Sequence, residues 1–381
     1  MTSTWRMAAP VLCGALAGGV VAVWPLYRHL RTEHELTVAA REYRIRAEQG
    51  DPQAQYRLAR SYAEGKGVPR SRAEAIRWYR KAADQGYAKA EYGLGYSYSH
   101  GLGVAEDPVE AVRWTRKAAE QGDAEAQASL GACYAEGLGV AKDDAAAIEW
   151  YRKAAAQDEM RGEYGLGSAY YYGAGLPQDY TQAAEWYRKS ATHGYAAAEY
   201  GLGTLYYYGN GVRQDYSEAA RWYRAAAEQD DVMAENGLGY LYAHGLGVPR
   251  DYGQAFRWCR KAAEQGDAAA QDYLGYALAG GIGVPRSYAE SAHWYHKAAM
   301  QGNSHAQYGI GYRYARGEGV PRDVVEARMW ILLSDAHASG DLKENCAKEL
   351  DWLASHSTAQ ELAESSRRAR NWRQSETAPE E

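Results

Sequence analysis

The sequence predicts an all-α solenoid built from helix–turn–helix repeats of 36 residues, and three regularities indicate it. Tryptophan recurs every 36 residues, without one insertion or deletion. A pair of glycines interrupts each copy, and an Asp or Ser follows six residues after the first glycine. Self-similarity at a fixed period of this size is typical of repeat arrays, in which each unit packs against its neighbours. The tryptophans are Trp78, Trp114, Trp150, Trp186, Trp222, Trp258, Trp294 and Trp330.

The first helix of each copy is predicted from apolar and small residues at steps of three and four. In the fifth copy this stretch contains Leu202 and Gly203, and we expect the leucine to pack while the glycine lets a neighbouring helix approach closely. The paired glycines end this helix, because glycine readily takes the left-handed conformation that closes a helix. No strand pattern precedes them, so they are not a phosphate-binding loop. The pairs are Gly65/Gly67, Gly101/Gly103, Gly137/Gly139, Gly173/Gly175, Gly209/Gly211, Gly245/Gly247, Gly281/Gly283 and Gly317/Gly319.

The second helix of each copy is predicted to begin after an Asp or Ser whose side chain accepts hydrogen bonds from the first-turn amides. In seven of the eight copies Glu or Gln stands three residues further on, which completes a capping box. We expect the tryptophan of this helix to be a packing side chain, and the Arg-Lys pairs that follow it, such as Arg80 and Lys81, to form a solvated outer face. The capping residues are Ser71, Asp107, Asp143, Asp179, Asp215, Asp251, Ser287 and Asp323.

The two ends of the chain depart from the repeat, as the ends of repeat arrays do. We expect residues 32–340 to form the solenoid, with a partial copy followed by eight full copies. Residues 341–374 are predicted to form a helical cap, and residues 375–381 a disordered tail, because the last stretch is short and polar.

Residues 1–31 form a separate N-terminal segment. From Met7 to Tyr27 no residue is charged, and the length of 21 residues suits one bilayer crossing. Three interpretations are open: an uncleaved membrane anchor, a cleaved secretion signal, or a buried hydrophobic cap on the first repeat. The length and flanking charges favour a single-pass anchor through residues 7–27. The repeats are then expected on the periplasmic, extracytoplasmic side, with the cytoplasmic side as the alternative.

Composition narrows the classes of function. Lys and Arg total 43 against 49 Asp and Glu, and the resulting charge of −6 gives no electrostatic footprint for nucleic acid. The four cysteines are dispersed, so no disulfide framework is expected. No grouping of catalytic residues is present, and we expect neither an enzyme nor a cofactor. His293, His296 and His305 suggest a metal site only weakly, because no Glu or Cys partner stands at ligand spacing.

The repeat unit Ala-x-Ala-Gln/Glu-Tyr-x-Leu-Gly-x-x-Tyr-x-x-Gly-x-Gly-Val-Pro-x-Asp-Tyr-x-x-Ala-x-x-Trp-Tyr-Arg-Lys-Ala-Ala-x-Gln-Gly resembles the Sel-1-like repeat, a relative of the tetratricopeptide repeat. The resemblance covers roughly residues 42–340. It implies a right-handed α/α superhelix whose first helices make a concave face, used as an adaptor or scaffold for other proteins. The family has no common catalytic residues.

Positions that change from copy to copy are free for function, whereas identical positions serve stacking. The fourth and fifth copies carry tyrosines at variable positions of the first helix, and tyrosine is favoured at binding hot spots. We therefore predict a non-enzymatic scaffold that holds a peptide or protein segment in the concave groove. A carbohydrate or cell-envelope polymer binder is the alternative, because tyrosine rings also stack on sugars. The predicted contact residues are Tyr164, Tyr171, Tyr172, Tyr200, Tyr207, Tyr208, Tyr240 and His244.

Overall fold

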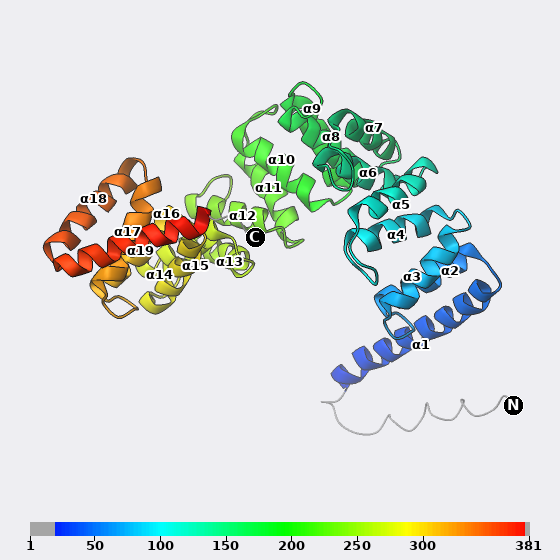
Figure 1. Cartoon of the computed structure of the whole chain (residues 1–381), viewed down its shortest axis with the longest axis horizontal. Helices are drawn as coiled ribbons and strands as arrows, with labels where there is room; N and C mark the ends of the chain where they lie inside the picture. Colours follow the sequence, from blue (N-terminus) through cyan, green and yellow to red (C-terminus); the bar gives the residue numbers. More distant parts are fainter. Residues whose placement is uncertain (1–19, 378–381) are drawn as a thin grey trace. The chain divides into compact units, whose positions relative to one another are not determined.

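The computed structural model describes residues 20–377, with side chains described for residues 34–372, and every regular element in this range is a helix. The chain divides into two compact units, one up to residue 166 and one from residue 167. Figure 1 shows successive helices lying side by side along the chain. The helices are α1 (Val20–Glu48), α2 (Pro52–Glu64), α3 (Arg72–Ala83), α4 (Ala88–Ser99), α5 (Pro108–Glu120), α6 (Ala124–Glu136), α7 (Asp144–Ala155), α8 (Met160–Tyr172), α9 (Tyr180–Thr192), α10 (Ala196–Tyr208), α11 (Tyr216–Ala227), α12 (Val232–His244), α13 (Tyr252–Glu264), α14 (Ala268–Gly280), α15 (Tyr288–Met300), α16 (Ser304–Arg316), α17 (Val324–His337), α18 (Gly340–Ser355) and α19 (Ala359–Thr377).

The predicted repeat of two helices is confirmed. Eight pairs follow one another from α2/α3 to α16/α17, and each predicted capping residue accepts a hydrogen bond from a first-turn amide of its second helix. At α11, for example, Oδ1 of Asp215 accepts from the amides of Ser217 at 2.9 Å and Glu218 at 3.1 Å. The first helix α10 ends at Gly209, whose φ of 76° is in the left-handed region.

In seven of the eight copies a glycine follows the buried leucine or isoleucine of the first helix, and it permits close packing within a pair, as the sequence predicted; the first copy has Ala59 there. A Cβ atom added to Gly203 would lie 2.7 Å from Cδ1 of Tyr223, on the second helix of the same copy. Leu202 beside it is fully buried. The fifth copy therefore brings α10 and α11 together at a distance that only glycine allows.

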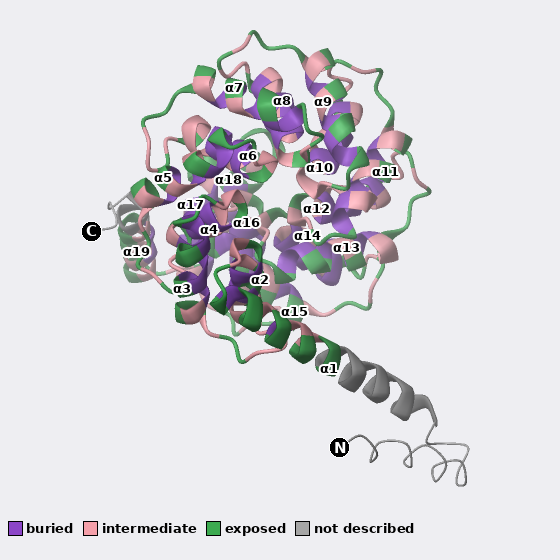
Figure 2. Cartoon of the chain, turned by 90° about the vertical axis from the view of Figure 1, so that its right-hand side faces the viewer, coloured by how far each residue is buried: buried purple, intermediate pink, exposed green. Residues whose placement is uncertain are grey.

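In α7, α9, α11 and α15 the most buried ring is the tyrosine that follows the tryptophan. Tyr223 is 6% exposed, whereas Trp222 is half-buried. Trp258 and Trp294 likewise pack as partly buried rings at the edge of the core clusters. In Figure 2 the buried positions lie on the helices, and the connecting turns are half-buried or exposed. The tryptophans are therefore packing side chains, but they lie at the rim of the core in the middle copies.

The basic pairs after the tryptophans have defined partners instead of being only solvated. In six copies the lysine ammonium lies over the ring of the tryptophan three residues earlier, at 3.8 to 5.0 Å from its centre. The arginine donates to the hydroxyl of a tyrosine 18 residues further on, as Arg116 does to Tyr134 at 2.8 Å. The arginine–tyrosine bonds join the second helix of one copy to the first helix of the next, whereas each lysine–tryptophan contact lies within one helix.

The prediction of a single-pass membrane anchor is wrong for the part of the chain that the structure describes. Between residues 20 and 377 no helix is long and apolar enough to cross a bilayer. The helix α1 contains only residues 20–27 of the predicted segment and continues through Arg28, Arg31 and Glu33 to Glu48, so its apolar part is too short. Residues 7–19 of the predicted segment lie outside the described residues. The localisation inferred from that anchor is withdrawn with it.

Two further helices, α18 and α19, follow the last repeat. Cys346 and Leu353 of α18 are fully buried in one cluster with Ile331 of α17. From α19, the ring of Trp372 packs edge-on against Trp330 at 5.1 Å between ring centres. Trp330 is consequently 2% exposed, in contrast to the half-buried tryptophans of the middle copies.

Candidate functional site

A cavity of about 480 Å³ opens in the second unit on the side formed by the first helices α10, α12 and α14. Five of the eight predicted contact residues line it, although they come from two different copies of the repeat. They are Tyr200, Tyr207 and Tyr208 of α10, with Tyr240 and His244 of α12.

The floor of this tyrosine cavity is fixed by the stacking of two rings. Tyr200 stacks on Tyr223 with 5.5 Å between ring centres and 24° between planes. The hydroxyl of Thr204 lies 3.2 Å from the hydroxyl of Tyr223 and donates to the carbonyl of Tyr200 at 3.0 Å. Because both rings are held by neighbours within the fold, this wall is preformed before any ligand arrives.

Tyr207 is the central ring of the cavity. It packs edge-on against Tyr208 at 4.8 Å, against Tyr216 at 5.5 Å and against Tyr240 at 6.2 Å between ring centres. Burial, with a contribution from the nearby hydroxyl of Tyr240, raises the pKa of Tyr207 to about 12. Like any tyrosine hydroxyl, that of Tyr207 carries its proton at neutral pH and is able to donate a hydrogen bond.

Tyr240 and His244 form the opposite rim as a stacked pair. Their ring centres lie 4.0 Å apart with 27° between planes, and Nδ1 of His244 lies 2.9 Å from the carbonyl oxygen of Tyr240. A similar pair, Tyr96 and His100, occurs in the first unit with ring centres 4.2 Å apart. The stacked arrangement is therefore a local property of this Tyr-x-x-x-His spacing on a helix.

The other three predicted residues lie on α8. Tyr171 packs edge-on against Tyr172 at 4.8 Å and against Tyr180 at 5.3 Å between ring centres. Burial raises the pKa of Tyr171, and Tyr172, Tyr200 and Tyr208 add smaller contributions through their charges. Tyr172 is 74% exposed, whereas Tyr208, its equivalent one copy later, is 62% exposed. Tyr164 belongs to the first unit, while the other seven predicted residues belong to the second.

Tyr273 and Met233 also line the tyrosine cavity, and sequence reasoning missed both. The hydroxyl of Tyr273 is buried and has no hydrogen-bond partner among the described residues. Burial raises the pKa of this hydroxyl above its ordinary range. Tyr273 stands in a column that is glycine in five other copies, and that exchange is a signal that could have identified it. Met233 is 52% exposed and adds a flexible apolar side chain to the rim.

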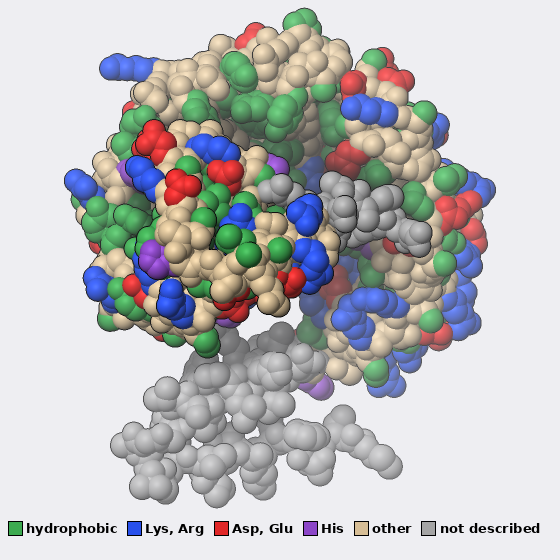
Figure 3. Space-filling view, turned by 60° about the vertical axis from the view of Figure 1, so that its left-hand side comes forward, with side chains coloured by type: hydrophobic (Ala, Val, Ile, Leu, Met, Phe, Trp, Pro, Cys, Tyr) green, Lys and Arg blue, Asp and Glu red, His purple; other side chains and the backbone are tan. Residues whose placement is uncertain are grey.

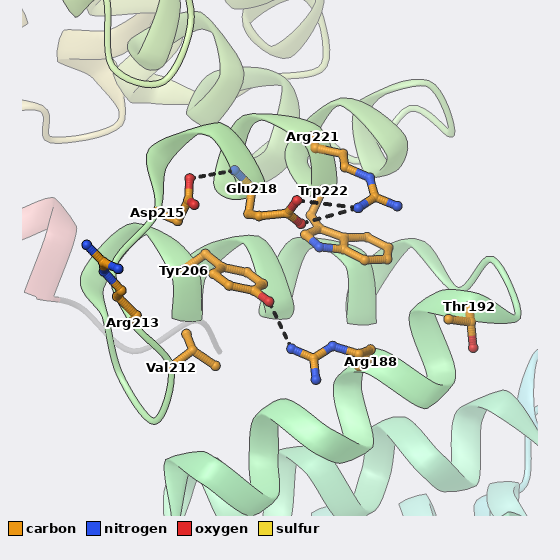
Figure 4. A pocket seen from close by; sticks show the side chains of 9 residues that line it. All are labelled: Arg188, Thr192, Tyr206, Val212, Arg213, Asp215, Glu218, Arg221 and Trp222. Atoms are coloured by element: carbon orange, nitrogen blue, oxygen red, sulfur yellow. Dashed lines mark hydrogen bonds and ion pairs between the residues drawn. The ribbon is translucent and has the colours of Figure 1, made fainter.

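A larger cavity, of about 720 Å³, lies where α9, α10 and α11 meet. Figure 4 shows two arginines of this cavity with their partners: Arg188 donates to Tyr206 at 2.8 Å, and Arg221 pairs with Glu218 at 3.3 Å. The Arg-to-Tyr bond recurs in other copies, so most of this lining belongs to the repeat lattice. The tyrosine cavity, whose lining departs from the lattice, is the better candidate site.

The distribution of charged side chains on the surface does not favour one class of ligand over another. On the face drawn in Figure 3, acidic and basic side chains are interspersed. Among the side chains that the structure describes, no group of three or more His, Cys, Asp or Glu residues is placed to hold a metal ion. The described cysteines Cys133, Cys259 and Cys346 are free thiols.

Comparison with known proteins places the chain in a family. The Sel1 repeat pattern matches eight consecutive segments, at residues 52–87, 88–123, 124–159, 161–195, 196–231, 232–267, 268–303 and 304–334. No curated protein matches the chain as a whole.

Two solved structures agree with this assignment. A Sel1 repeat protein from Oxalobacter formigenes is 32% identical, with 83% of this chain and 90% of that chain covered and a TM-score of 0.56. A protective antigen with the same repeat fold from uropathogenic Escherichia coli is 27% identical, with 90% and 98% covered and a TM-score of 0.50. Sel1 repeat proteins are generally protein–protein interaction scaffolds without catalytic activity. The chain belongs to the Sel1 repeat family.

Proposed function

We propose that this protein is a non-enzymatic scaffold that binds a segment of a partner protein in the tyrosine cavity. The observation that supports the proposal is the convergence of Tyr207, Tyr208 and Tyr240 from two copies on one cavity of about 480 Å³. Tyrosine is enriched among the residues that dominate binding energy, because it offers a large apolar ring and a hydrogen-bonding tip.

The chemistry of the lining defines what the segment should carry. The rings of Tyr207 and Tyr208 and the side chain of Met233 offer apolar surface. The hydroxyls of Tyr207 and Tyr273 are protonated at neutral pH, as tyrosine hydroxyls ordinarily are, and burial raises the pKa of both further. A peptide with an apolar or aromatic side chain and free backbone carbonyls satisfies both requirements, since the carbonyls accept from the hydroxyls.

A peptide selection on the full chain tests the proposal. Peptides enriched from a random display library are measured by fluorescence anisotropy against wild type and the Tyr208→Ala variant. Removal of a hot-spot ring costs about 2 kcal/mol, which corresponds to roughly a 30-fold weaker affinity. Tyr208 is 62% exposed, so this change leaves the packed core intact.

The first unit supplies a matched control. Tyr96 stacks on His100 as Tyr240 stacks on His244, yet it lies in another copy. Tyr240→Ala is expected to weaken peptide binding, and Tyr96→Ala to leave it unchanged. Failure to enrich any peptide, or equal loss in both variants, overturns the proposal. Binding to an array of glycans in place of peptides would favour a carbohydrate-binding function instead.

A further inference from the structure

Asp272 departs from its column in the repeat. The equivalent position is tyrosine in five of the other copies, including Tyr200 and Tyr308, whereas Asp272 places a carboxyl group on α14. An ionisable side chain in a column of aromatic packing residues is not required by the lattice. It is therefore a candidate for a function specific to this copy.

Asp272 lines a cavity of about 490 Å³ formed by α14, α16 and the first turns of α18. Aromatic rings make up much of the wall: Tyr276 extends from α14, and Tyr308 and Tyr312 extend from α16. The rings of Tyr308 and Tyr312 lie 6.2 Å apart, and Tyr276 is 56% exposed. The cavity thus combines a carboxylate with the faces of tyrosine rings.

No described side chain or backbone group forms a hydrogen bond or ion pair with the Asp272 carboxylate. His305 on α16 also lines the cavity, and its charge opposes the effect of burial on the pKa of the Asp272 carboxyl. Arg313 also lines the cavity, but its guanidinium pairs with Glu318. The other titratable groups that line the cavity are Asp341 of α18 and the hydroxyls of Tyr276, Tyr295, Tyr308 and Tyr312. A half-buried carboxylate without a cation is costly unless a ligand supplies one.

The same structure shows how a cation lies on one of these rings. The guanidinium of Arg316 lies 3.5 Å from the centre of the Tyr312 ring and pairs with Glu349 at 2.7 Å. A ring face and a carboxylate together therefore hold a guanidinium only one helix turn from the cavity. Tyr276 and Asp272 present the same two groups four residues apart on α14, whereas the guanidinium of Arg313 in this cavity lies over the Tyr312 ring at 5.2 Å.

We propose that this acidic cavity binds the ammonium or guanidinium group of a lysine or arginine side chain of the partner. The inference rests on the proposed function, because the basic residue would belong to the segment held in the tyrosine cavity. The two cavities are adjacent on one helix: Tyr273 of α14 lines the first, and Asp272 and Tyr276 line the second. The partner segment accordingly carries an apolar anchor followed or preceded by a basic residue.

Small cations test the acidic cavity without any peptide. The carboxyl carbon of Asp272 is followed by NMR in the full chain labelled with carbon-13 aspartate, and Asp272→Asn identifies the signal. The probes are methylguanidinium and butylammonium, with neutral N-butylacetamide as the control. A bound cation favours the charged carboxylate, so saturating probe should lower the Asp272 pKa by about one unit or more, while the neutral control leaves it unchanged. An unchanged Asp272 pKa with both cations overturns the inference.

Peptide selection gives the second arm. Peptides enriched against wild type should contain Lys or Arg, and Asp272→Asn should weaken them by about tenfold. Asp84→Asn, at an exposed position of the first unit, is the control and should have no effect. Asp272→Tyr restores the residue of the other copies and provides a second folded variant without the charge. If the enriched peptides show no preference for basic residues, the cation-binding inference is wrong and the proposed scaffold function is unaffected. If the library yields no peptide, the proposed scaffold function is wrong, and the titration with small cations tests the acidic cavity independently.

Discussion

The ammonium of Lys261 lies 5.0 Å from the centre of the Trp258 ring and 3.6 Å from a carboxylate oxygen of Glu235 on the preceding first helix. One lysine therefore neutralises a buried acid and covers an indole face at once. The fifth copy has Ala225 at the equivalent position, so Trp222 and Glu199 lack this lysine. Burial raises the pKa of Glu199, and the side-chain amide of Gln229 donates to its carboxylate at 2.8 Å.

We expect Ala225→Lys to stabilise the protein. The new ammonium would lie over Trp222 and beside Glu199, and a cation over an aromatic ring contributes about 0.5–1 kcal/mol at an exposed site. The thermal midpoint of the variant should rise, and the Glu199 pKa should fall. Lys261→Ala is the reverse change and should lower the midpoint. A midpoint that falls in Ala225→Lys would contradict the role assigned to this column.

Gly203→Ala should lower the stability of the protein, and Gly253→Ala should raise it. A Cβ at Gly203 would lie 2.7 Å from the buried ring of Tyr223, so Gly203→Ala forces α10 and α11 apart and costs about 1–3 kcal/mol. At Gly253 on α13 the nearest atom, Oδ1 of Asp251, is 3.3 Å away, and alanine favours the helix by about 0.5–1 kcal/mol. Thermal unfolding of both variants measures the difference, and a stable Gly203→Ala would refute the close approach.

Tyr208 and Tyr223 should separate binding from stability. Tyr208→Ala is expected to weaken peptide binding with little change in unfolding, because its ring is 62% exposed. Tyr223→Ala removes a ring that is 6% exposed, and it should cost about 3 kcal/mol of stability. Circular dichroism melts and anisotropy on the same samples give both quantities. Equal destabilisation by the two changes would mean that Tyr208 is a core residue.

Asp272 should make the stability of the protein depend on pH. Burial raises its pKa from 3.8 to about 6, so between these values the folded state binds more protons than the unfolded state. The free energy of unfolding therefore falls as the pH rises through this window. At pH 7.5 Asp272→Asn should raise the free energy of unfolding by an amount on the order of 2 kcal/mol, and the thermal midpoint should rise with it. At pH 3 wild type and variant should differ little. The difference between their midpoints as a function of pH is the measurement, and a constant difference would contradict the assignment.

Binding of a basic segment should have the opposite dependence on pH. The carboxylate form of Asp272 holds the cation, and that form is lost as the pH falls through about 6. Affinity measured by anisotropy should therefore fall between pH 7.5 and pH 5 in wild type and stay nearly constant in Asp272→Asn. A similar decrease in the variant would assign the effect to other groups.

The sequence by itself determined the repeat, the ends of its helices and the fold class. Asp215 caps α11 and Gly209 closes α10 through hydrogen bonds and backbone angles that involve only a few neighbouring residues, so a local pattern is sufficient to predict them. Variation between copies also indicated the tyrosines that now line one cavity. The predicted membrane anchor is contradicted within residues 20–377, where α1 has too short an apolar part because it continues as a polar helix.

Only the tertiary structure decided which side chains are buried and which groups meet. The pattern did not distinguish Trp222 at the rim from Tyr223 in the core, because burial depends on the first helix of the neighbouring copy as well as on spacing. The pattern also did not predict that Asp272 and Asp341, which follows the last repeat, line one cavity. It did not predict that Tyr207 and Tyr273 line another. Which distant residues line the same cavity depends on the rise and rotation from one helix pair to the next, and no local pattern of residues encodes that geometry.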